Sequence, residues 1–593
     1  MTDRKQWPRN CAILVFLCAI VYVFFLDGPF LSDDLAIIAA NPNIRHLGDV
    51  GQFFTPHYWN EVHTGTKGVF RPLREASFTL IYATLGLNPF YFHLASLLLH
   101  VAVVVLLYLL ARKLLEDDFA ALLGAAMFAA HPIHLEAVLW AKNVAEVMAA
   151  FFVVLAFMAF LRALRHQGRV SGAIAWCAGA SVLYALSLMC KESALALPGI
   201  LILYALLTAP RKQMRRALAM TAPLMVIGLA YVFFQFASSS LIAAAESAAA
   251  PQPEDSLLMR PALVAKTLLF YHRLLLFPLR LSTQYDFVFP SSYAAADTLP
   301  WLLGFGALLA AMLAGIALWR RGAYLLVWSV AFLVPAANII PLTGRPVGDV
   351  RVYVASIGPC LLFGLAAAAV WRLSRGRSMA RVAAALAIGA PLVAMIALSL
   401  DRGGIWHSEK LFWFDMLRKS PAQVEANLQV GEQELTEGRY LAALHRAVFA
   451  VDTGQKILRL APNQVDVVKR QLARSHILAG RCYGLLGDQI LATENFTEAV
   501  RLAPNMAGAH SNLGIAYLSQ DRPDLAAPEF LAATELDPGN PIYLTNLAAA
   551  ELSRNQPQAA LQALKQALSI APGYEPAAEL MRQIGGPQAV PPR

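Results

Sequence analysis

Residues 10–34 read NCAILVFLCAIVYVFFLDGPFLSDD. The run from Asn10 to Leu26 is apolar and close to the roughly 20 residues that a helix needs to cross a bilayer. Shortly after it, Asp33 and Asp34 stand next to each other at the predicted membrane surface. Carboxylates at that position are costly unless they are paired or serve a function. This stretch therefore predicts a membrane helix that leads into a functional acidic turn.

The composition extends the membrane prediction to most of the chain. Of 593 residues, 58% are hydrophobic and 15% are charged, whereas soluble proteins are about 45–50% apolar and about 25% charged. The net charge is +9. The basic residues gather in short loops between apolar runs, which is the pattern that sets membrane orientation, and no nucleic-acid-binding motif accompanies them. The six cysteines include no CxxC pair, which excludes a disulfide framework and a thiolate zinc site.

About eleven apolar runs are candidate membrane spans. They cover residues 10–26, 91–111, 119–138, 144–161, 172–190, 194–209, 217–236, 300–319, 323–341, 351–371 and 380–400. With these spans, every cluster of Lys and Arg falls on the side of the N-terminus, which is therefore predicted to be the cytoplasmic side. The first run has no small-x-small cleavage pattern after it, so we interpret it as a retained anchor.

Residues 263–280 are apolar but contain four basic side chains, namely Lys266, His272, Arg273 and Arg280. Counting this stretch as another span would place later basic clusters on both sides of the membrane. We predict an interfacial or re-entrant helix on the outer side, with a true span as the alternative.

The C-terminal part of the chain carries a 34-residue repeat. Small residues at 480, 514 and 548, apolar plugs at 496, 530 and 564, and prolines at 504, 538 and 572 recur at that spacing. This is the tetratricopeptide signature, in which helical pairs stack into a solenoid with a concave surface for peptides or partner proteins. The predicted fold is all-α, with a polytopic membrane domain over 1–405, a linker and degenerate helical repeat over 406–472, and three repeats over 473–585.

With this topology the unexplained polar stretches lie on the outer side, where we expect the chemistry. At Asp33 and Asp34, partial desolvation and a like-charged neighbour raise a carboxylate's pKa, which suits a general base. A helix N-cap before Leu35 is an equally good interpretation. Lys191 and Glu192 separate two apolar runs and form a pair that would orient the lysine toward an anion; a surface ion pair of little energy is the alternative.

Three further stretches are candidates for contacts with a phosphate or a sugar. The motif from His131 through His134 to Glu136 can make such contacts or cap a helix, and its spacing is not a standard zinc pattern, so no metal site is predicted. Arg345, Arg351 and Tyr353 flank an outer loop, where arginines bind phosphate in a bidentate manner or extend to lipid headgroups. Arg71 precedes a proline and can anchor a phosphate or its own loop.

Taken in order, these stretches resemble one family. The order is the acidic turn, Phe70-Arg71-Pro72-Leu73, Phe92-His93-Leu94, Leu98-Leu99-His100, the His131–Glu136 motif followed by Ala-Val, Lys191-Glu192, Pro335-Ala336-Ala337-Asn338 through Tyr353, and the repeats. This combination resembles the transmembrane and tetratricopeptide repeat-containing O-mannosyltransferases, which belong to the glycosyltransferases of the GT-C fold. The resemblance covers nearly the whole chain.

The resemblance implies a polyprenyl-phosphate-linked sugar as donor, an inverting transfer to a hydroxyl, and no cofactor or metal. It implies that Asp33 or Asp34 is the base, with Asp33 slightly favoured. It further implies that Arg351 and Lys191 bind the leaving phosphate, with Glu192, Tyr353 and Arg345 beside them, that His131, His134 and Glu136 line the donor pocket, and that Arg71 holds the first outer loop. The chain departs from the family at Lys142-Asn143 and at Asp349-Val350, so we expect mannose or another hexose.

Three functions stay open at this point. The favoured one is transfer to Ser or Thr of a secreted polypeptide presented by the repeats; the others are transfer to a glycolipid or envelope polysaccharide, and a non-enzymatic scaffold built on the repeats. The expected location is a bacterial inner membrane, with a cytoplasmic N-terminus and periplasmic repeats. The expected partners are the bilayer, the lipid-linked sugar and an acceptor or partner protein, and not nucleic acid.

Overall fold

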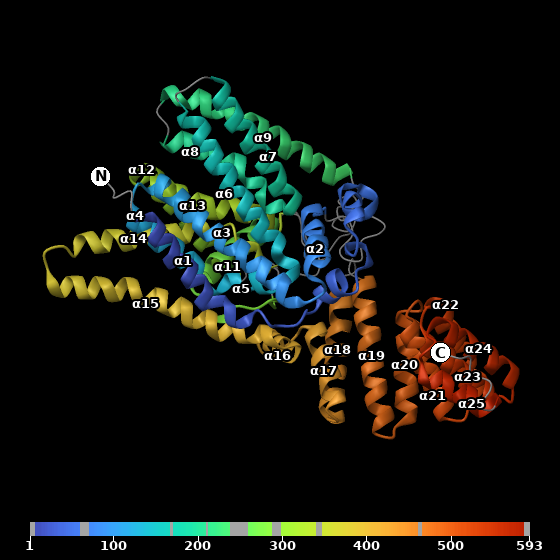
Figure 1. Cartoon of the computed structure of the whole chain (residues 1–593). Helices are drawn as coiled ribbons and strands as arrows, with labels where there is room; N and C mark the ends of the chain where they lie inside the picture. The colour runs from blue at the N-terminus through green and yellow to red at the C-terminus, as the bar shows by residue number, and fades with distance from the viewer. Residues whose placement is uncertain are drawn as a thin grey trace. The chain divides into compact units, whose positions relative to one another are not determined.

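The computed structural model describes residues 6–59, 70–166, 170–208, 211–237, 259–286, 298–339, 347–460 and 465–585. All regular elements in these ranges are helices, which confirms the all-α fold class. The chain divides into two compact units, Met1–Asp415 (unit 1) and Met416–Arg593 (unit 2), whose helices are labelled in Figure 1. The division falls within α16 (Glu409–Lys419), and the predicted end of the membrane domain at residue 405 stays a prediction.

Unit 1 contains seven described helices that are long and apolar enough to cross a membrane. They are α1 (Trp7–Tyr22) with η1 (Val23–Phe25), α3 (Pro89–Leu115), η7 (Ala141–Asn143) with α6 (Val144–Arg165), α7 (Val170–Cys190), α9 (Arg211–Ala237), α12 (Leu299–Leu318), and α15 (Ser378–Gly403) with η13 (Gly404–His407). Three shorter apolar segments are η8 (Glu192–Ala196) with α8 (Leu197–Thr208), α13 (Arg320–Leu333) with η11 (Val334–Ala336), and α14 (Ile357–Leu373). Together with the bent pair described next, a helix occupies each predicted apolar run.

The bent pair consists of α4 (Asp118–Ala130) and α5 (Leu135–Leu139), which meet at an angle of 50°. Between them lies the 3₁₀ turn η6 (Pro132–His134), whose proline lacks an N–H and disfavours a helical residue before it. His131 is extended, and its Nδ1 accepts a hydrogen bond from the Ile133 N–H at 3.2 Å. The histidine thus caps η6, and the bend brings the His131–Glu136 motif into the interior of the unit, where all three of its polar side chains are buried.

Glycines allow some of these helices to pack closely. A Cβ at Gly364 of α14 would lie 2.1 Å from the Ala120 carbonyl oxygen of α4, and one at Gly358 would lie 2.1 Å from the Leu325 carbonyl oxygen of α13. Membrane helices associate largely through such backbone approaches, because lipid supplies no hydrophobic driving force between them. Any larger residue at these positions would separate α14 from its neighbours.

The described residues between η1 and α3 form a packed structure and not an open connection. It contains the π-helix η2 (Leu35–Ala39), the 3₁₀ turns η3 (Pro42–Ile44) and η4 (Leu47–Phe54), and α2 (Pro72–Leu85). Aromatic side chains from these elements, from the residues around them and from α3 belong to one buried cluster, which includes Phe30, Phe53, Tyr58, Trp59, Phe70, Phe78 and Phe92. This core fixes the position of the acidic turn that precedes η2.

The stretch predicted as interfacial or re-entrant forms one continuous helix, α11 (Arg260–Leu276), followed by the short turn η10 (Pro278–Arg280). Lys266, Thr267 and Tyr271 of α11 are buried within unit 1. Pro278 accounts for the end of the helix, because a proline disfavours helical geometry at the residue before it. Its relation to the bilayer surface stays a prediction.

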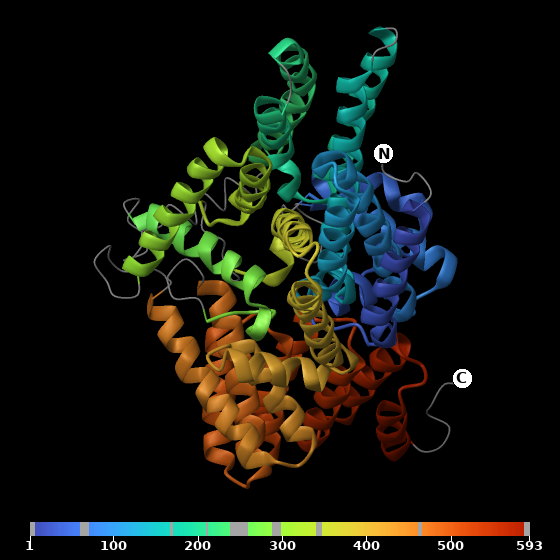
Figure 2. The same ribbon diagram turned by 90° about the vertical axis from the view of Figure 1, so that its left-hand side faces the viewer.

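Unit 2 is a series of helical hairpins, seen in orange to red in Figures 1 and 2. It comprises α17 (Val424–Thr436), α18 (Tyr440–Leu460), α19 (Val465–Leu485), α20 (Gln489–Leu502), α21 (Ala507–Ser519), α22 (Pro523–Leu536), α23 (Pro541–Ser553), α24 (Pro557–Ile570) and α25 (Glu575–Gly585). A Cβ at Gly480 would lie 2.6 Å from the Phe496 ring, and one at Gly514 would lie 2.8 Å from the Phe530 ring. The repeated glycine therefore makes room for the repeated aromatic ring.

Candidate active site

The acidic turn comprises Leu31–Asp34, between α1 and η2. Ser32 has a φ of 51°, a left-handed conformation that costs a non-glycine residue about 1 kcal/mol or more and that clusters at functional sites. The Leu31 carbonyl accepts hydrogen bonds from the Asp34 N–H at 3.0 Å and from Trp140 Nε1 at 3.1 Å. These bonds hold the strained turn, and the turn places Asp33 and Asp34 in different surroundings.

Asp34 is buried, with 1% of its surface exposed. Its Oδ1 accepts a hydrogen bond from the Lys142 backbone N–H at 2.8 Å, and its Oδ2 accepts one from the Leu31 N–H at 3.4 Å. Burial raises the pKa of this carboxyl to about 7, although the backbone N–H and the charge of Lys142 act in the opposite direction. Asp34 therefore ties the acidic turn to η7, just before α6, through Oδ1, and braces the turn itself through Oδ2.

Asp33 faces outward, with 56% of its side chain exposed, and forms an ion pair with the Lys142 ammonium group. The Lys142 Nζ also lies 3.8 Å from the centroid of the Trp140 ring, so the ring and the carboxylate hold the amine between them. Of the two carboxylates, Asp33 is the one that an incoming molecule can reach.

Glu146 lies four residues after Lys142, in the first turn of α6. Glu146 is buried, forms an ion pair with the Lys191 ammonium at 2.9 Å and accepts a hydrogen bond from Ser193 Oγ at 3.0 Å. Burial lowers the pKa of Lys191, and the nearby Glu146 carboxylate opposes that shift. The start of α6 thus joins the acidic turn to a buried cation.

Arg71, at the start of α2, binds both carboxylate oxygens of Glu192, at 3.1 and 3.2 Å. The sequence suggested that Lys191 and Glu192 pair with each other, but each has a partner from another element. The reason is that Lys191 is extended (φ −162°, ψ 145°), and consecutive residues of an extended segment point to opposite sides. We call Arg71, Glu146, Lys191 and Glu192 the cation cluster, which joins α2, α6 and η8.

The His131–Glu136 motif lies against residues that follow η12 (Asp349–Val352). His134 contacts the Phe128 carbonyl through Nδ1 and Ser356 Oγ through Nε2, both at 2.8 Å. The Tyr353 hydroxyl lies 2.5 Å from His100 Nδ1, and the Tyr353 ring lies 4.8 Å from that of His134. His131 Nε2 lies 2.9 Å from the Leu275 carbonyl. These buried rings form a connected group in which both nitrogens of His134 are engaged.

Arg351 is half-buried in η12, which packs against η6 and α5. Its turn is held by the fully buried Asp349, which pairs with Arg402 of α15 at 2.8 Å and accepts a hydrogen bond from the Tyr285 hydroxyl. The pair connects η12 to α15, and losing either partner would leave an uncompensated buried charge. Arg345 lies outside the described residues.

The structure brings the sequence-predicted residues into neighbouring groups. The histidine group and Arg351 meet where η12 packs on η6 and α5, while Lys142 and Glu146 connect the acidic turn to the cation cluster along the start of α6. The sequence predicted no role for Lys142, Glu146 or Arg402. A signal for them existed, because each is a charged residue at the end of an apolar run, but their partners are more than forty residues away.

In the ranges that the structure describes, no group of three or more His, Cys, Asp or Glu side chains is placed to hold a metal ion. All six cysteines are free. The polar groups that converge here are carboxylates and cations, which suit proton transfer and anion binding.

The chain is similar to several known proteins. Tetratricopeptide repeat models match residues 473–506, 491–541 and 511–575. Mouse protein O-mannosyl-transferase TMTC2 is 29% identical over 200 residues, which is 33% of this chain and 24% of that protein. Human protein O-mannosyl-transferase TMTC1 is 31% identical over 34% of this chain and 24% of its own. Mouse TMTC4 is 24% identical over 73% of this chain and 65% of its own. The predicted family resemblance is confirmed.

The aligned part of the chain spans about a quarter of the length of the TMTC1 and TMTC2 relatives. Among solved structures, the oligosaccharyltransferase of Archaeoglobus fulgidus aligns over 70% of this chain and 58% of its own, with a TM-score of 0.42 and 16% identity. The tetratricopeptide protein YrrB aligns over 36% of this chain and 96% of its own, with a TM-score of 0.22 and 20% identity.

Proposed function

We propose that this protein transfers a hexose, mannose in the first instance, from a polyprenyl-phosphate donor to a hydroxyl of a polypeptide. The support is the sequence similarity to protein O-mannosyl-transferases together with one structural observation: an exposed carboxylate, Asp33, stands on a turn that Lys142 and the start of α6 connect to the cation cluster. Such a transfer needs a base for the acceptor and cations for the leaving phosphate.

In this reaction the acceptor oxygen attacks the anomeric carbon of the sugar from the face opposite the phosphate. The carbon–oxygen bond to the phosphate breaks, and the polyprenyl phosphate leaves with the bonding electrons. The hydroxyl proton passes to Asp33, and the configuration at the anomeric carbon inverts. Asp33 is assigned as the base because a base must first be within reach of its proton, and Asp34 is enclosed with both oxygens bonded to the backbone.

Arg351 and Lys191 are assigned to the leaving phosphate. Arg351 offers a planar guanidinium that matches two phosphate oxygens, and Lys191 offers a buried ammonium whose charge is shared with Glu146. The arriving phosphate would compete with Glu146 for that ammonium, so the strongest interaction is expected when the leaving group gains charge. His131, His134 and Glu136 support the wall behind Arg351, since η12 packs on their turn.

The test uses purified full-length protein, polyprenyl-phosphate-mannose and a Ser/Thr-rich acceptor peptide. We expect Asp33→Asn to lower kcat by about 10²–10⁴-fold, the usual contribution of general base catalysis. Asp49→Asn removes a carboxylate from the same loop, in η4, and should retain activity. Full activity of Asp33→Asn would reject the assignment, and transfer to an envelope glycolipid but not to any peptide would reject the acceptor class.

We further propose that the repeats of unit 2 present the acceptor polypeptide. Helical-pair solenoids bind extended peptides on their concave surface. Removing residues 473–593 should therefore raise the KM for a long acceptor protein much more than for a short acceptor peptide. If both KM values stay unchanged, the repeats serve another partner.

The orientation is proposed from the distribution of basic residues, with the acidic turn and the repeats on the periplasmic side of a bacterial inner membrane. A reporter that is active only in the periplasm, fused after the last residue, should be active. A reporter fused at the α9 N-terminus, next to Arg215 and Arg216, should be inactive. The opposite pair of results would reverse the topology.

A further inference from the structure

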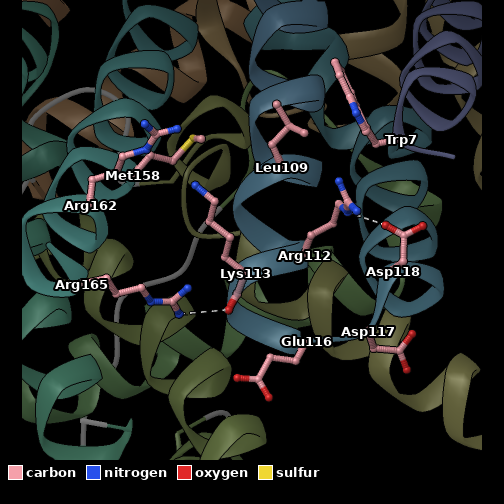
Figure 3. Close-up of a pocket in the computed structure, with 10 residues that line it drawn as sticks. All are labelled: Trp7, Leu109, Arg112, Lys113, Glu116, Asp117, Asp118, Met158, Arg162 and Arg165. Atoms are coloured by element: carbon pink, nitrogen blue, oxygen red, sulfur yellow. Dashed lines mark hydrogen bonds and ion pairs between the residues drawn. The ribbon is translucent and has the colours of Figure 1, made fainter. Parts of the chain in front are cut away.

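A second charged site lies at the end of α6 opposite to Lys142 and Glu146. A pocket of about 870 Å³ opens there, lined by Trp7, Leu109, Arg112, Lys113, Glu116, Asp117, Asp118, Met158, Arg162 and Arg165 (Figure 3). Because α3 ends at Leu115 and α6 ends at Arg165, the pocket lies at the level where two spans leave the bilayer. No residue of the acidic turn or the cation cluster lines it.

Part of the charge in this pocket is paired. Asp118 forms an ion pair with Arg112 at 2.5 Å and accepts a hydrogen bond from Asn10 Nδ2 at 2.9 Å. Asp117 accepts hydrogen bonds from the N–H groups at the start of α4 and forms an ion pair with Arg372. Both aspartates therefore have cationic partners that leave little of their charge for the rest of the pocket.

The other cations are Lys113, Arg162 and Arg165, and within the described ranges none of the three forms an ion pair with a carboxylate. Lys113 interacts electrostatically with both arginines, and Arg165 Nη2 donates to the Lys113 carbonyl at 3.5 Å. Figure 3 shows the side chains of Lys113 and Arg162 extending toward the same region of the pocket. The dipoles of α3 and α6 favour cations at their C-termini, but three cations against Glu116, the remaining carboxylate of the lining, leave a net positive charge that a further anion would offset.

The same pocket has an apolar wall. Leu109 and Met158 line it from α3 and α6, and Trp7 of α1 borders it while 44% exposed. Tryptophan is enriched at the level of lipid headgroups. A cationic floor next to an apolar wall at the bilayer surface fits a molecule that joins an anionic head to hydrocarbon chains.

We propose that this pocket binds the phosphate of an anionic phospholipid. Lys113, Arg162 and Arg165 surround the phosphate, as in basic pockets between membrane helices that hold anionic headgroups. Leu109 and Met158 contact the part of the acyl chains that is nearest to the headgroup. Inorganic phosphate shares the chemistry of the headgroup but leaves the apolar wall uncovered, so it should bind more weakly.

The test measures the thermal unfolding midpoint of the full chain in neutral detergent with added phosphatidylglycerol, phosphatidylcholine or inorganic phosphate. Phosphatidylglycerol should raise the midpoint in a saturable way, and the other two should not at equal concentration. The variant Lys113→Gln/Arg162→Gln should weaken the apparent affinity for phosphatidylglycerol at least tenfold. The matched control is Arg375→Gln/Arg377→Gln. It removes two exposed charges that are close in sequence to Arg372, the partner of Asp117, but that do not line the pocket. This control should keep the wild-type affinity.

A second variant guards against misfolding of the first. Met158→Trp leaves every charge in place but narrows the pocket beside the cations, and should also weaken binding of phosphatidylglycerol. Equal loss in the Arg375/Arg377 control, or wild-type binding in both pocket variants, would overturn the proposal in favour of general attraction to anionic membranes. A midpoint shift of equal size with inorganic phosphate would assign the pocket to a soluble anion and overturn the lipid assignment.

Discussion

The titration of Asp34 offers a test of how the acidic turn is held. Burial places its pKa at about 7, whereas an aspartate in an unfolded chain has a pKa near 3.9. The folded protein therefore binds a proton more tightly than the unfolded chain does. The contribution of this group to stability is greatest at low pH, where both states are protonated, and it falls as the pH rises through this interval.

The size of the effect follows from linkage. Between pH 5 and pH 8 the titration of Asp34 lowers the free energy of unfolding of the wild type by roughly 2–3 kcal/mol, because each unit of pKa difference is worth about 1.4 kcal/mol. In Asp34→Asn this group no longer titrates. The variant cannot accept a hydrogen bond from both the Lys142 and Leu31 N–H groups, which costs about 1–3 kcal/mol at every pH. Relative to the wild type, the variant should therefore be destabilised at pH 5 and recover by pH 8.

The assay is thermal unfolding of the wild type and the variant at pH 5, 6, 7 and 8 in the same detergent. For a unit of this size, 2–3 kcal/mol corresponds to a change of roughly 2–4 °C in the difference between the two midpoints. Asp33→Asn is the matched control, because that side chain is largely exposed and its charge is the smallest of the causes that shift the Asp34 pKa, so its difference from the wild type should change much less with pH. A constant difference for Asp34→Asn would refute the reasoning, since it would mean that the backbone hydrogen bonds outweigh burial.

Three further changes test other parts of the structure. Arg402→Met leaves the buried Asp349 carboxylate without its cation and should lower stability by about 3–5 kcal/mol; adding Asp349→Asn should recover part of the unfolding midpoint. Arg351→Gln should raise the KM for the lipid-linked donor about 10–100-fold while the unfolding midpoint stays the same, as loss of a charge-assisted hydrogen bond predicts; an unchanged KM would remove Arg351 from the donor site. Gly514→Val places side-chain atoms against the Phe530 ring, 2.8 Å from the position of the new Cβ, and should destabilise the repeats by about 1–3 kcal/mol; limited proteolysis of the full chain should then cut within α21 and α22 first, and wild-type resistance would show that the ring moves aside.

The repeats illustrate how much local sequence can reveal. A 34-residue period with glycine and an aromatic residue at fixed positions specifies two packed helices, and the structure places Gly480 against Phe496 and Gly514 against Phe530. The apolar runs behave similarly, since a helix occupies each of them. In both cases the relevant partners lie within one unit of the pattern, so the pattern contains the information.

The site residues show where that information ends. Asp33 and Asp34 are chemically identical neighbours, and only the left-handed Ser32 and the Lys142 N–H decide that one is exposed and the other buried. Lys191 and Glu192 looked like a pair because they are adjacent, but their partners are Glu146 and Arg71.

By itself, the sequence determined that this is a helical membrane chain with a repeat solenoid and with carboxylates and cations at the ends of its spans. These properties depend on composition and on spacing along one helix or one repeat. Only the tertiary structure decided which carboxylate is accessible, which cation each acid binds, and which basic residues surround a pocket at the other end of α6. Those outcomes depend on burial and on contacts between residues far apart in the chain, and no local pattern encodes the solvent that a side chain loses when distant helices pack around it.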